Sequence, residues 1–348
     1  MIAPAGHRTV RRHNLALVLG CVAEAEPLSR ARVAERTGLT RGTVSSLVDE
    51  LITAGLVTEL AAERGGPGRP AAPLQLNRNG PAGLGLELGV DRLGACVVDL
   101  TGAVRAQRIV PSEHVDADPE GVLDALAELA AAVRAEAALP IAGAHLAVPG
   151  IVGESAIVRL PNLSRWAGVD AAGGLAARLG CATGIANEAD LAALAELWFG
   201  RTPADFLYAS IGIGIGAGVV IGGELFRGPG GRAGELGHMV VEPGGPPCRC
   251  GGRGCLERLV DLRDLDRSAR ALGAALTGAV ALLDVRTIVL GGLDPAVAEP
   301  LRAAVAAELA ELDPPVTVTV SDPGAGGALR GAAATVVRAV IRSPDGGR

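Results

Sequence analysis

Apolar residues fall at helical spacing in the first part of the chain and predict three short helices. In residues 14–24 the apolar positions on one face are Leu15, Val18, Leu19 and Val22. A second helix is predicted over residues 30–37, with Ser29 as its N-cap and a tight turn after it at Gly38. The third begins after Thr40, and its apolar positions repeat at i, i+3, i+4 and i+7, namely Val44, Leu47, Val48 and Leu51.

The pattern then changes to short extended segments. Gly55 ends the third helix, and residues 56–60 begin a strand. A run rich in Gly, Pro and Arg at residues 64–70 precedes a second strand at residues 74–76. Two strands joined by such a tip predict a wing near residues 58–76. The order of helix, turn, helix and wing is typical of a winged helix-turn-helix, which we assign to residues 1–80.

From residue 81 onward the pattern predicts a duplicated α/β domain. A β-meander near residues 85–110 is followed by a helix over 119–139 and a buried strand over 141–148. After a helix over 187–199, a second meander starts at residue 206 and is followed by a helix over 265–283 and a strand over 287–290. Two such halves in tandem indicate two lobes, with a ligand cleft expected between them.

Composition and charge separate the two parts. Residues 1–80 contain ten Arg and seven acidic residues, whereas residues 81–348 contain 22 Arg and 31 acidic residues. The net charges are therefore +3 and −9, so a polyanion is expected to meet only the front end. The start of the chain lacks an apolar signal region, and no uncharged apolar run could span a bilayer. We therefore expect a cytoplasmic protein that does not contact membranes.

Candidate DNA contacts gather at the start of the third helix and in the wing. The outward positions there carry short polar groups and one arginine, which suit base edges and phosphates in a major groove: Thr40, Arg41, Thr43, Ser45 and Ser46. Arginines of the second helix, Arg30, Arg32 and Arg36, are candidates for backbone phosphates. Arg64 and Arg69 at the wing tip suit a narrow minor groove. The alternative is a helical trimer that packs on another part of the protein, with the Gly/Pro run as a linker.

A compact group of metal-binding residue types lies in the second half of the chain. His238 is followed by Cys248, Cys250 and Cys255, so three thiols and one imidazole fall within eighteen residues. That set suits a closed tetrahedral Zn²⁺ site, and intervening glycines allow the backbone to wrap a small ion. Glu235 and Glu257 flank the group. Six cysteines in a chain with no secretion signal favour metal binding over a disulfide framework.

These motifs resemble the ROK family (repressor, open reading frame, kinase). The resemblance rests on the run from residue 211 to His238, on the cysteine group that follows, and on the stretch from Asn187 to Glu196. The front end is similar to the winged helix of that family's xylose and N-acetylglucosamine repressors. The resemblance implies a two-lobed, actin-like sugar-kinase fold over residues 81–348. Lobe 1 would comprise about 81–185 plus a C-terminal helix near 329–342, and lobe 2 about 186–328 with the metal group at 238–257.

The resemblance also implies residue roles. It makes His238, Cys248, Cys250 and Cys255 the ligands of a structural Zn²⁺. It places sugar-hydroxyl contacts at Asn162, Asn187, Glu188, Glu235, His238 and Glu257. Carboxylates and amides are the groups that pair with vicinal hydroxyls, and charge-assisted hydrogen bonds are the strong ones. His238 would use one ring nitrogen for zinc and the other for the sugar. The alternative without a ligand is that Asn187, Glu188 and Glu196 belong to a solvated helix start, where the helix dipole favours acids, and that Glu235 and Glu257 are surface charges near glycines.

The same resemblance argues against kinase activity. The first phosphate turn of the family's kinases corresponds to Glu87, Gly89-Val90 and Asp91, where a valine side chain and a carboxylate oppose phosphate binding. Ile213 removes a hydroxyl donor from the second turn, and the base position holds Glu188, one methylene longer than the family's Asp. We therefore expect no catalytic residues. The segment between Glu257 and residue 290 is shorter than the family pattern.

The resulting hypothesis is a sugar-responsive DNA-binding repressor of carbohydrate uptake or catabolism genes. Its expected partners are operator DNA, a sugar or sugar phosphate, and further copies of itself in a homodimer or homotetramer. Sugar in the cleft would shift the lobes and change the spacing of two winged helices. Two alternatives stay open: an ATP-dependent sugar kinase of the same family, and a DNA-bound regulator that senses a protein partner.

Overall fold

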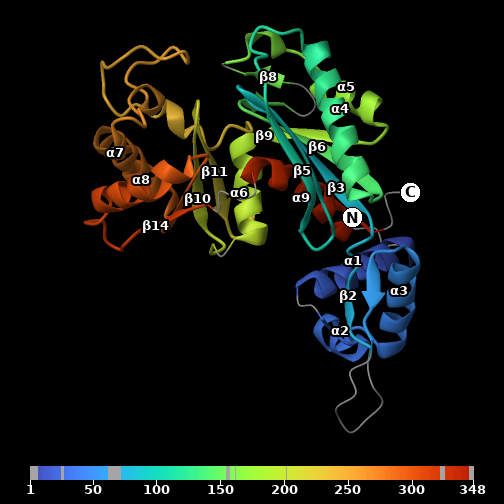
Figure 1. Cartoon of the computed structure of the whole chain (residues 1–348). Helices are drawn as coiled ribbons and strands as arrows, with labels where there is room; N and C mark the ends of the chain where they lie inside the picture. The colour runs from blue at the N-terminus through green and yellow to red at the C-terminus, as the bar shows by residue number, and fades with distance from the viewer. Residues whose placement is uncertain are drawn as a thin grey trace, which may run out of the picture.

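The computed structural model describes residues 7–24, 27–61, 72–153, 157–160, 162–200, 202–321 and 326–344. The candidate DNA contacts Arg64 and Arg69 lie outside the described residues. Figure 1 shows a small N-terminal unit beside a larger two-lobed part. The larger part carries the two sheets whose facing ends form the candidate site.

The N-terminal unit is a winged helix-turn-helix. Its elements are α1 (His7–Glu24), α2 (Arg30–Thr37), α3 (Arg41–Thr53), β1 (Val57–Glu59) and β2 (Leu74–Leu76). The Ser29 hydroxyl accepts from Arg32 N, the Thr40 hydroxyl accepts from Thr43 N, and Gly38 adopts φ 71° at the end of α2. The predicted caps are therefore confirmed. Helix α1 begins earlier than predicted, because its first turns carry polar residues and leave no apolar period to detect.

The larger part contains two five-stranded sheets with the same topology. The first has the order β5-β4-β3-β6-β9, and the second has the order β12-β11-β10-β13-β14. In each, the first three strands form an antiparallel meander, and the last two run parallel to the first strand. The predicted duplication is confirmed. The strands are β3 (Ala82–Leu88), β4 (Arg92–Val98), β5 (Val104–Pro111), β6 (Ile141–Val148), β9 (Thr183–Asn187), β10 (Phe206–Ile211), β11 (Ile215–Ile221), β12 (Glu224–Leu225), β13 (Thr287–Gly291) and β14 (Thr317–Val320).

Helices cover both faces of each sheet. The first sheet carries α4 (Pro119–Ala137) and α5 (Ala171–Leu179) outside, and a small ribbon of β7 (Ile151–Val152) and β8 (Ile157–Arg159) lies nearby. The second sheet carries α7 (Leu265–Leu283) and α8 (Pro295–Glu308) outside. The remaining helices, α6 (Glu188–Phe199) and α9 (Gly327–Arg342), pack against each other between the sheets (Figure 1). Three short 3-10 turns are η1 (Ser164–Trp166), η2 (Leu236–His238) and η3 (Leu256–Arg258).

The backbone of helix α9 lies very close to the backbones of α6 and β3. A Cβ added at Gly331 would lie 1.8 Å from the Leu191 carbonyl oxygen of α6. A Cβ at Gly83 or Gly85 of β3 would lie 2.1 or 2.2 Å from a carbonyl oxygen of α9. Glycine is therefore required on both sides of this helix, because any side chain would force the elements apart.

The winged helix-turn-helix does not have a hydrophobic core separate from that of the larger part. Its buried residues form one cluster with Cys96 and Val98 of β4 and with Leu329, Ala333 and Val337 of α9. Helix α1 also packs directly on α9. The winged helix-turn-helix is thus built onto the lobe that contains the first sheet. Among the described helices, none is long and apolar enough to cross a membrane.

Candidate functional site

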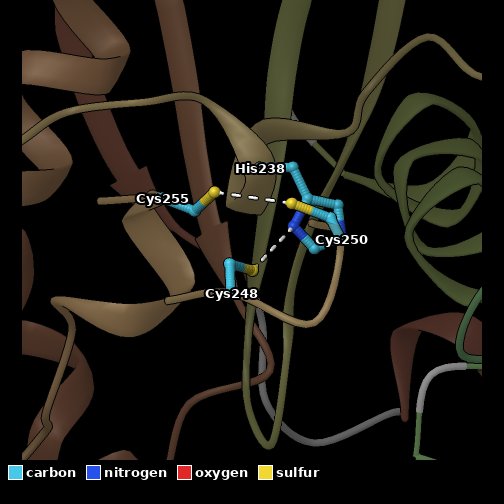
Figure 2. A group of neighbouring side chains, drawn as sticks. All are labelled: His238, Cys248, Cys250 and Cys255. Atoms are coloured by element: carbon cyan, nitrogen blue, oxygen red, sulfur yellow. Dashed lines mark hydrogen bonds between the residues drawn. The ribbon is translucent and has the colours of Figure 1, made fainter. Parts of the chain in front are cut away.

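The predicted metal ligands converge in the structure. The ligand atoms of His238, Cys248, Cys250 and Cys255 all lie within 4.8 Å of one another (Figure 2). Cys250 Sγ is 3.6 Å from Cys255 Sγ, and Cys248 Sγ is 3.7 Å from His238 Nδ1. Ligands bonded tetrahedrally to Zn²⁺ are about 3.5–3.8 Å apart. The three thiols and one imidazole are therefore a possible metal-binding cluster of the right size and donor type.

Tight turns bring the four ligands together. Cys248 N donates to Gly252 O at 2.9 Å, and Gly251 N donates to Cys248 O at 3.1 Å. Gly254 has φ 70°, and a Cβ there would lie 1.6 Å from the Glu242 carbonyl oxygen. No other residue type fits such a close backbone approach. Gly254, one of the glycines predicted to let the chain wrap an ion, is thus also required by packing inside the loop.

A cavity of about 610 Å³ lies next to this cluster, between the two lobes. All six residues predicted to contact sugar line it: Asn162, Asn187, Glu188, Glu235, His238 and Glu257. They come from both lobes and lie up to 95 positions apart in the chain, as 257 minus 162 gives. The structure therefore brings the whole predicted set to one cavity.

His238 joins the metal cluster to the cavity. Its Nδ1 faces Cys248 Sγ, while its Nε2 lies 3.8 Å from Glu235 Oε2. A ring with one nitrogen held by a metal presents the other nitrogen in a fixed direction. Nearby, Glu257 Oε2 accepts from Ile215 N at 3.4 Å, so this carboxylate is held against the start of β11. The arrangement suits the fixed presentation of polar groups to a hydroxylated ligand.

Asn187 and Glu188 lie where β9 meets α6. Asn187 Oδ1 accepts from Ala189 N at 2.7 Å and from Asp190 N at 3.3 Å, and its Nδ2 donates to Gly150 O at 2.9 Å. Asn187 therefore caps helix α6, and one N–H of its side-chain amide remains available to a ligand. Desolvation, reinforced by the Glu87 charge, raises the pKa of Glu188 to about 7. This carboxyl changes charge near neutral pH.

The cavity is also lined by the positions where the resemblance predicted poor phosphate binding. Arg92 Nη2 and Nε lie 2.8 and 2.9 Å from Glu87 Oε1, and Glu87 is 2% exposed. Val90 and Asp91 line the cavity, and so does Ile213, which leaves 57% of its surface exposed. Arg92, which is paired with the buried Glu87 and lies 3.7 Å from Asp91 Oδ1, a valine and two carboxylates therefore occupy the positions where hydrogen-bond donors would be needed for phosphate.

For two residues near the cavity, Asp190 and Arg249, the sequence analysis predicted no role. Asp190 is 9% exposed, and burial raises its pKa to about 6, while Arg227 Nε lies 3.6 Å from its Oδ2. Its position three residues after Asn187 was the available signal. Arg249, between two predicted metal ligands, donates from Nη1 to Asn162 Oδ1. No sequence pattern indicated that contact, because the partners lie in different lobes.

The candidate DNA contacts occupy the surface of α2 and the start of α3. Arg32, Thr40, Arg41 and Ser46 are exposed, and Thr43 and Ser45 are partly exposed. Arg30 is different. Its Nη2 lies 2.8 Å from both Asp49 Oδ1 and Glu59 Oε1, and its Nη1 donates to Ser45 O at 3.2 Å. Arg30 therefore ties α2 to α3 and β1, which is a different role from the phosphate contact expected from the sequence.

Comparisons with known proteins agree with this architecture. Residues 83–265 match the ROK family, and residues 16–66 match the MarR family. A putative xylose repressor from Caldicellulosiruptor sp. strain Rt8B.4 is 35% identical over 266 residues, which is 74% of this chain and 66% of that protein. This chain thus spans slightly less than two thirds of that relative's length.

Solved structures show the same fold. A ROK family transcriptional regulator, described as a homologue of the E. coli MLC protein, superposes with a TM-score of 0.80 at 23% identity. The match covers 96% of this chain and 97% of that one. A ROK hexokinase from Thermus thermophilus superposes with a TM-score of 0.61 at 30% identity, over 73% of this chain and 97% of that one. The two-lobed part is thus shared with a kinase, and the whole architecture with a regulator.

Proposed function

Because the chain belongs to the ROK family and carries a winged helix-turn-helix in front of the family's two-lobed domain, we propose that it is a sugar-responsive DNA-binding repressor of carbohydrate uptake or catabolism genes. The relative named putative xylose repressor supports this assignment. We place the boundary between the DNA-binding and sugar-binding domains near residue 80, with the lobe limits given above. We further propose that the protein works in the cytoplasm as a homodimer or homotetramer.

One observation carries the proposal. The winged helix shares a hydrophobic cluster with β4 and α9, so it moves with the lobe that forms one wall of the cleft. Helix α9 packs closely on α6, whose N-cap Asn187 and first residue Glu188 line the ligand cavity. A change in lobe arrangement at the cavity would therefore be transmitted to the DNA-binding unit through packed helices.

The mechanism follows from this connection. A sugar that binds one lobe arrangement better than the other shifts the population toward it. In a dimer, rotation of the lobes changes the separation and angle of the two recognition helices. Operator half-sites are spaced at helical turns of DNA. The two recognition helices can therefore enter both half-sites only when the distance between the helices matches that spacing. Sugar binding would thus lower operator affinity and release the repressed genes.

The charges of the cleft favour an uncharged sugar as the ligand. Among the described residues that line the cavity, six are acidic, namely Glu87, Asp91, Glu188, Asp190, Glu235 and Glu257, and one is an arginine, Arg92. That arginine is already paired with Glu87. Carboxylates accept hydrogen bonds from sugar hydroxyls, whereas they repel a phosphate group. We therefore favour the free sugar over its phosphate.

We propose that the metal is a structural Zn²⁺ held by His238, Cys248, Cys250 and Cys255. The donor set of three thiols and one imidazole supports zinc, which takes four such ligands when its role is structural. When bound, the ion would fix the loop that presents Glu235, His238 and Glu257 to the cavity. Its contribution is thus to the shape of the sugar site.

We also propose that the protein lacks kinase activity. Phosphoryl transfer depends on donors that cradle and neutralise the phosphates. The corresponding positions in this cavity are Val90, Asp91 and Ile213, and the arginine that lines it is engaged by Glu87. A raised pKa at Glu188 would suit a base, so the decisive deficit lies in nucleotide binding. Sugar-dependent ATP hydrolysis at a normal enzymatic rate would contradict this proposal.

For the DNA interface we propose Thr40, Arg41, Thr43, Ser45 and Ser46 in the major groove, Arg32 on the phosphate backbone, and Arg64 and Arg69 of the wing in the minor groove. Arg30 would act indirectly, by holding α3 in place through Asp49 and the Ser45 carbonyl. The start of α3 supports this choice because its outward groups are polar and exposed.

The testing experiment is a gel shift on DNA from upstream of the protein's own gene. The metal-loaded full chain would be assayed alone, with D-xylose, D-glucose and N-acetyl-D-glucosamine, and with the 6-phosphates of the last two. Release by a free sugar supports the whole proposal. Release by a sugar phosphate alone would contradict the charge argument, and specific binding that no sugar changes would favour a protein partner as the signal.

A further inference from the structure

One residue of the metal loop reaches across the cleft to the other lobe. Arg249 Nη1 donates to Asn162 Oδ1, and Arg159 Nη2 donates to the Arg249 carbonyl oxygen at 2.8 Å. Arg159 ends β8, and Asn162 follows it by three positions, so both belong to the first lobe. Arg249 belongs to the metal loop of the second lobe. The two hydrogen bonds therefore join the walls of the cavity directly.

The position of Arg249 in the chain links this contact to the predicted metal ligands. It lies between Cys248 and Cys250, two of the four predicted ligands. A metal bound by both thiols would hold the backbone on each side of Arg249, and so would fix the direction of its side chain and carbonyl group. Without the metal, both groups would be free to turn away from the first lobe.

The partner on the other side is part of the candidate sugar site. Asn162 lines the cavity, and its neighbours Leu163 and Trp166 are fully buried in the first lobe's core. Arg249 donates a hydrogen bond to the Asn162 side-chain oxygen, and this bond orients the Asn162 amide group. The N–H donors of that amide group remain available for other partners. A fixed amide loses less freedom when a ligand binds.

We propose that Arg249 is a positioning residue that couples metal binding to the opposite wall of the cleft. It holds Asn162 and the end of β8 in the arrangement that binds ligand. The contact itself does not depend on the identity of the ligand, although its use in sugar sensing rests on the proposed function. Metal loss would then affect Asn162 in one lobe as well as Glu235 and Glu257 in the other.

The first test measures backbone hydrogen exchange in the metal-loaded full chain without any sugar. Leu163 N donates to Leu160 O, and Trp166 N donates to Leu163 O, each at 3.1 Å, so these amides report on the Asn162 segment. We expect Arg249→Ala to raise their exchange about three- to tenfold, as loss of one exposed charged hydrogen bond would. Metal content, measured by atomic emission, should stay at the wild-type value.

Arg253 provides a matched control. It is also an exposed arginine between two predicted ligands, but the hydrogen bond that its Nη2 donates, to Gly244 O at 3.5 Å, stays within the same loop. Arg253→Ala should leave exchange of the Asn162 segment unchanged. Equal exchange in Arg249→Ala and wild type, an equal effect of Arg253→Ala, or loss of metal from Arg249→Ala would each overturn the proposal.

The second test uses a sugar that binds the wild-type protein in the panel above. Arg249→Ala should raise its Kd about three- to tenfold, and should have little further effect in an Asn162→Ala background, because the arginine acts through that amide. Full additivity of the two changes would contradict this route. If no sugar binds the wild-type protein, the sugar-sensing proposal fails, while the exchange measurement still decides the contact.

Discussion

Replacing Gly331 with Ala should separate α6 from α9 and weaken both the fold and the sugar site. The added Cβ would lie 1.8 Å from the Leu191 carbonyl oxygen and 2.6 Å from its carbon. Ordinary contact begins at 3.4 Å, so the two backbones must move apart by about 1.6 Å (3.4 minus 1.8). Both partners are helix backbone inside a packed core, and neither can turn away. Overpacking of this kind costs about 1–3 kcal/mol.

The assay is thermal unfolding of the metal-loaded full chain, followed by circular dichroism. A cost of about 1–3 kcal/mol corresponds to a Tm lower by roughly 2–5 °C for a domain of this size. The matched control is Gly20→Ala in the interior of α1, where an added Cβ meets nothing within 4 Å. That change should stabilise by about 0.5–1 kcal/mol through helix propensity. If both variants shift Tm equally, the close approach of α6 and α9 is not the cause, and the reasoning is wrong.

Four further outcomes are expected. Cys250→Ser should lose metal, by atomic emission, and with it the sugar response in the gel shift, whereas Cys181→Ser, outside the cluster, should keep both. Arg41→Ala should weaken operator binding about tenfold at constant salt and reduce the salt slope by about 1, measured by titration at several salt concentrations. Arg30→Ala should mainly lower Tm, by about 2–4 °C, because its partners Asp49 and Glu59 lie within the domain. The pKa of Glu188 is raised to about 7, so its ionisation destabilises the native state increasingly between pH 4.5 and 7, and fully above that range. Glu188→Gln removes this ionisation. It should therefore raise Tm by about 2–6 °C at pH 8 and have little effect on Tm at pH 5.

Local chemistry explains which elements could be predicted. Ser29 and Thr40 are caps because a hydroxyl satisfies amides two or three residues away, and the apolar repeat of α3 needs only its own helical period. The same holds for strands β6 and β10 and helix α7, whose bounds agree with the pattern. Where the local signal was absent, as in the polar first turns of α1, the prediction was short.

The metal cluster was predictable for the same reason. Its four ligands lie within eighteen residues, and the turns between them are made by glycines whose conformation is a local property. The residues predicted to contact sugar are spread over 95 positions and were found through the family resemblance. Their convergence on one cavity required the two sheets to be placed with their ends facing.

The sequence by itself thus determined six of the helices, α1 to α4, α6 and α7, the two β-meanders, the winged helix and the donor set of the candidate metal cluster, since each depends on spacing along the chain; helices α5 and α8 and the order of the strands were not predicted. Only the tertiary structure decided that Arg30 holds α3 in place, that Arg249 reaches Asn162 across the cleft, and that the winged helix is built onto α9. These contacts join residues from different elements or lobes. Their partners are chosen by how the elements pack, and no periodicity in the sequence carries that information.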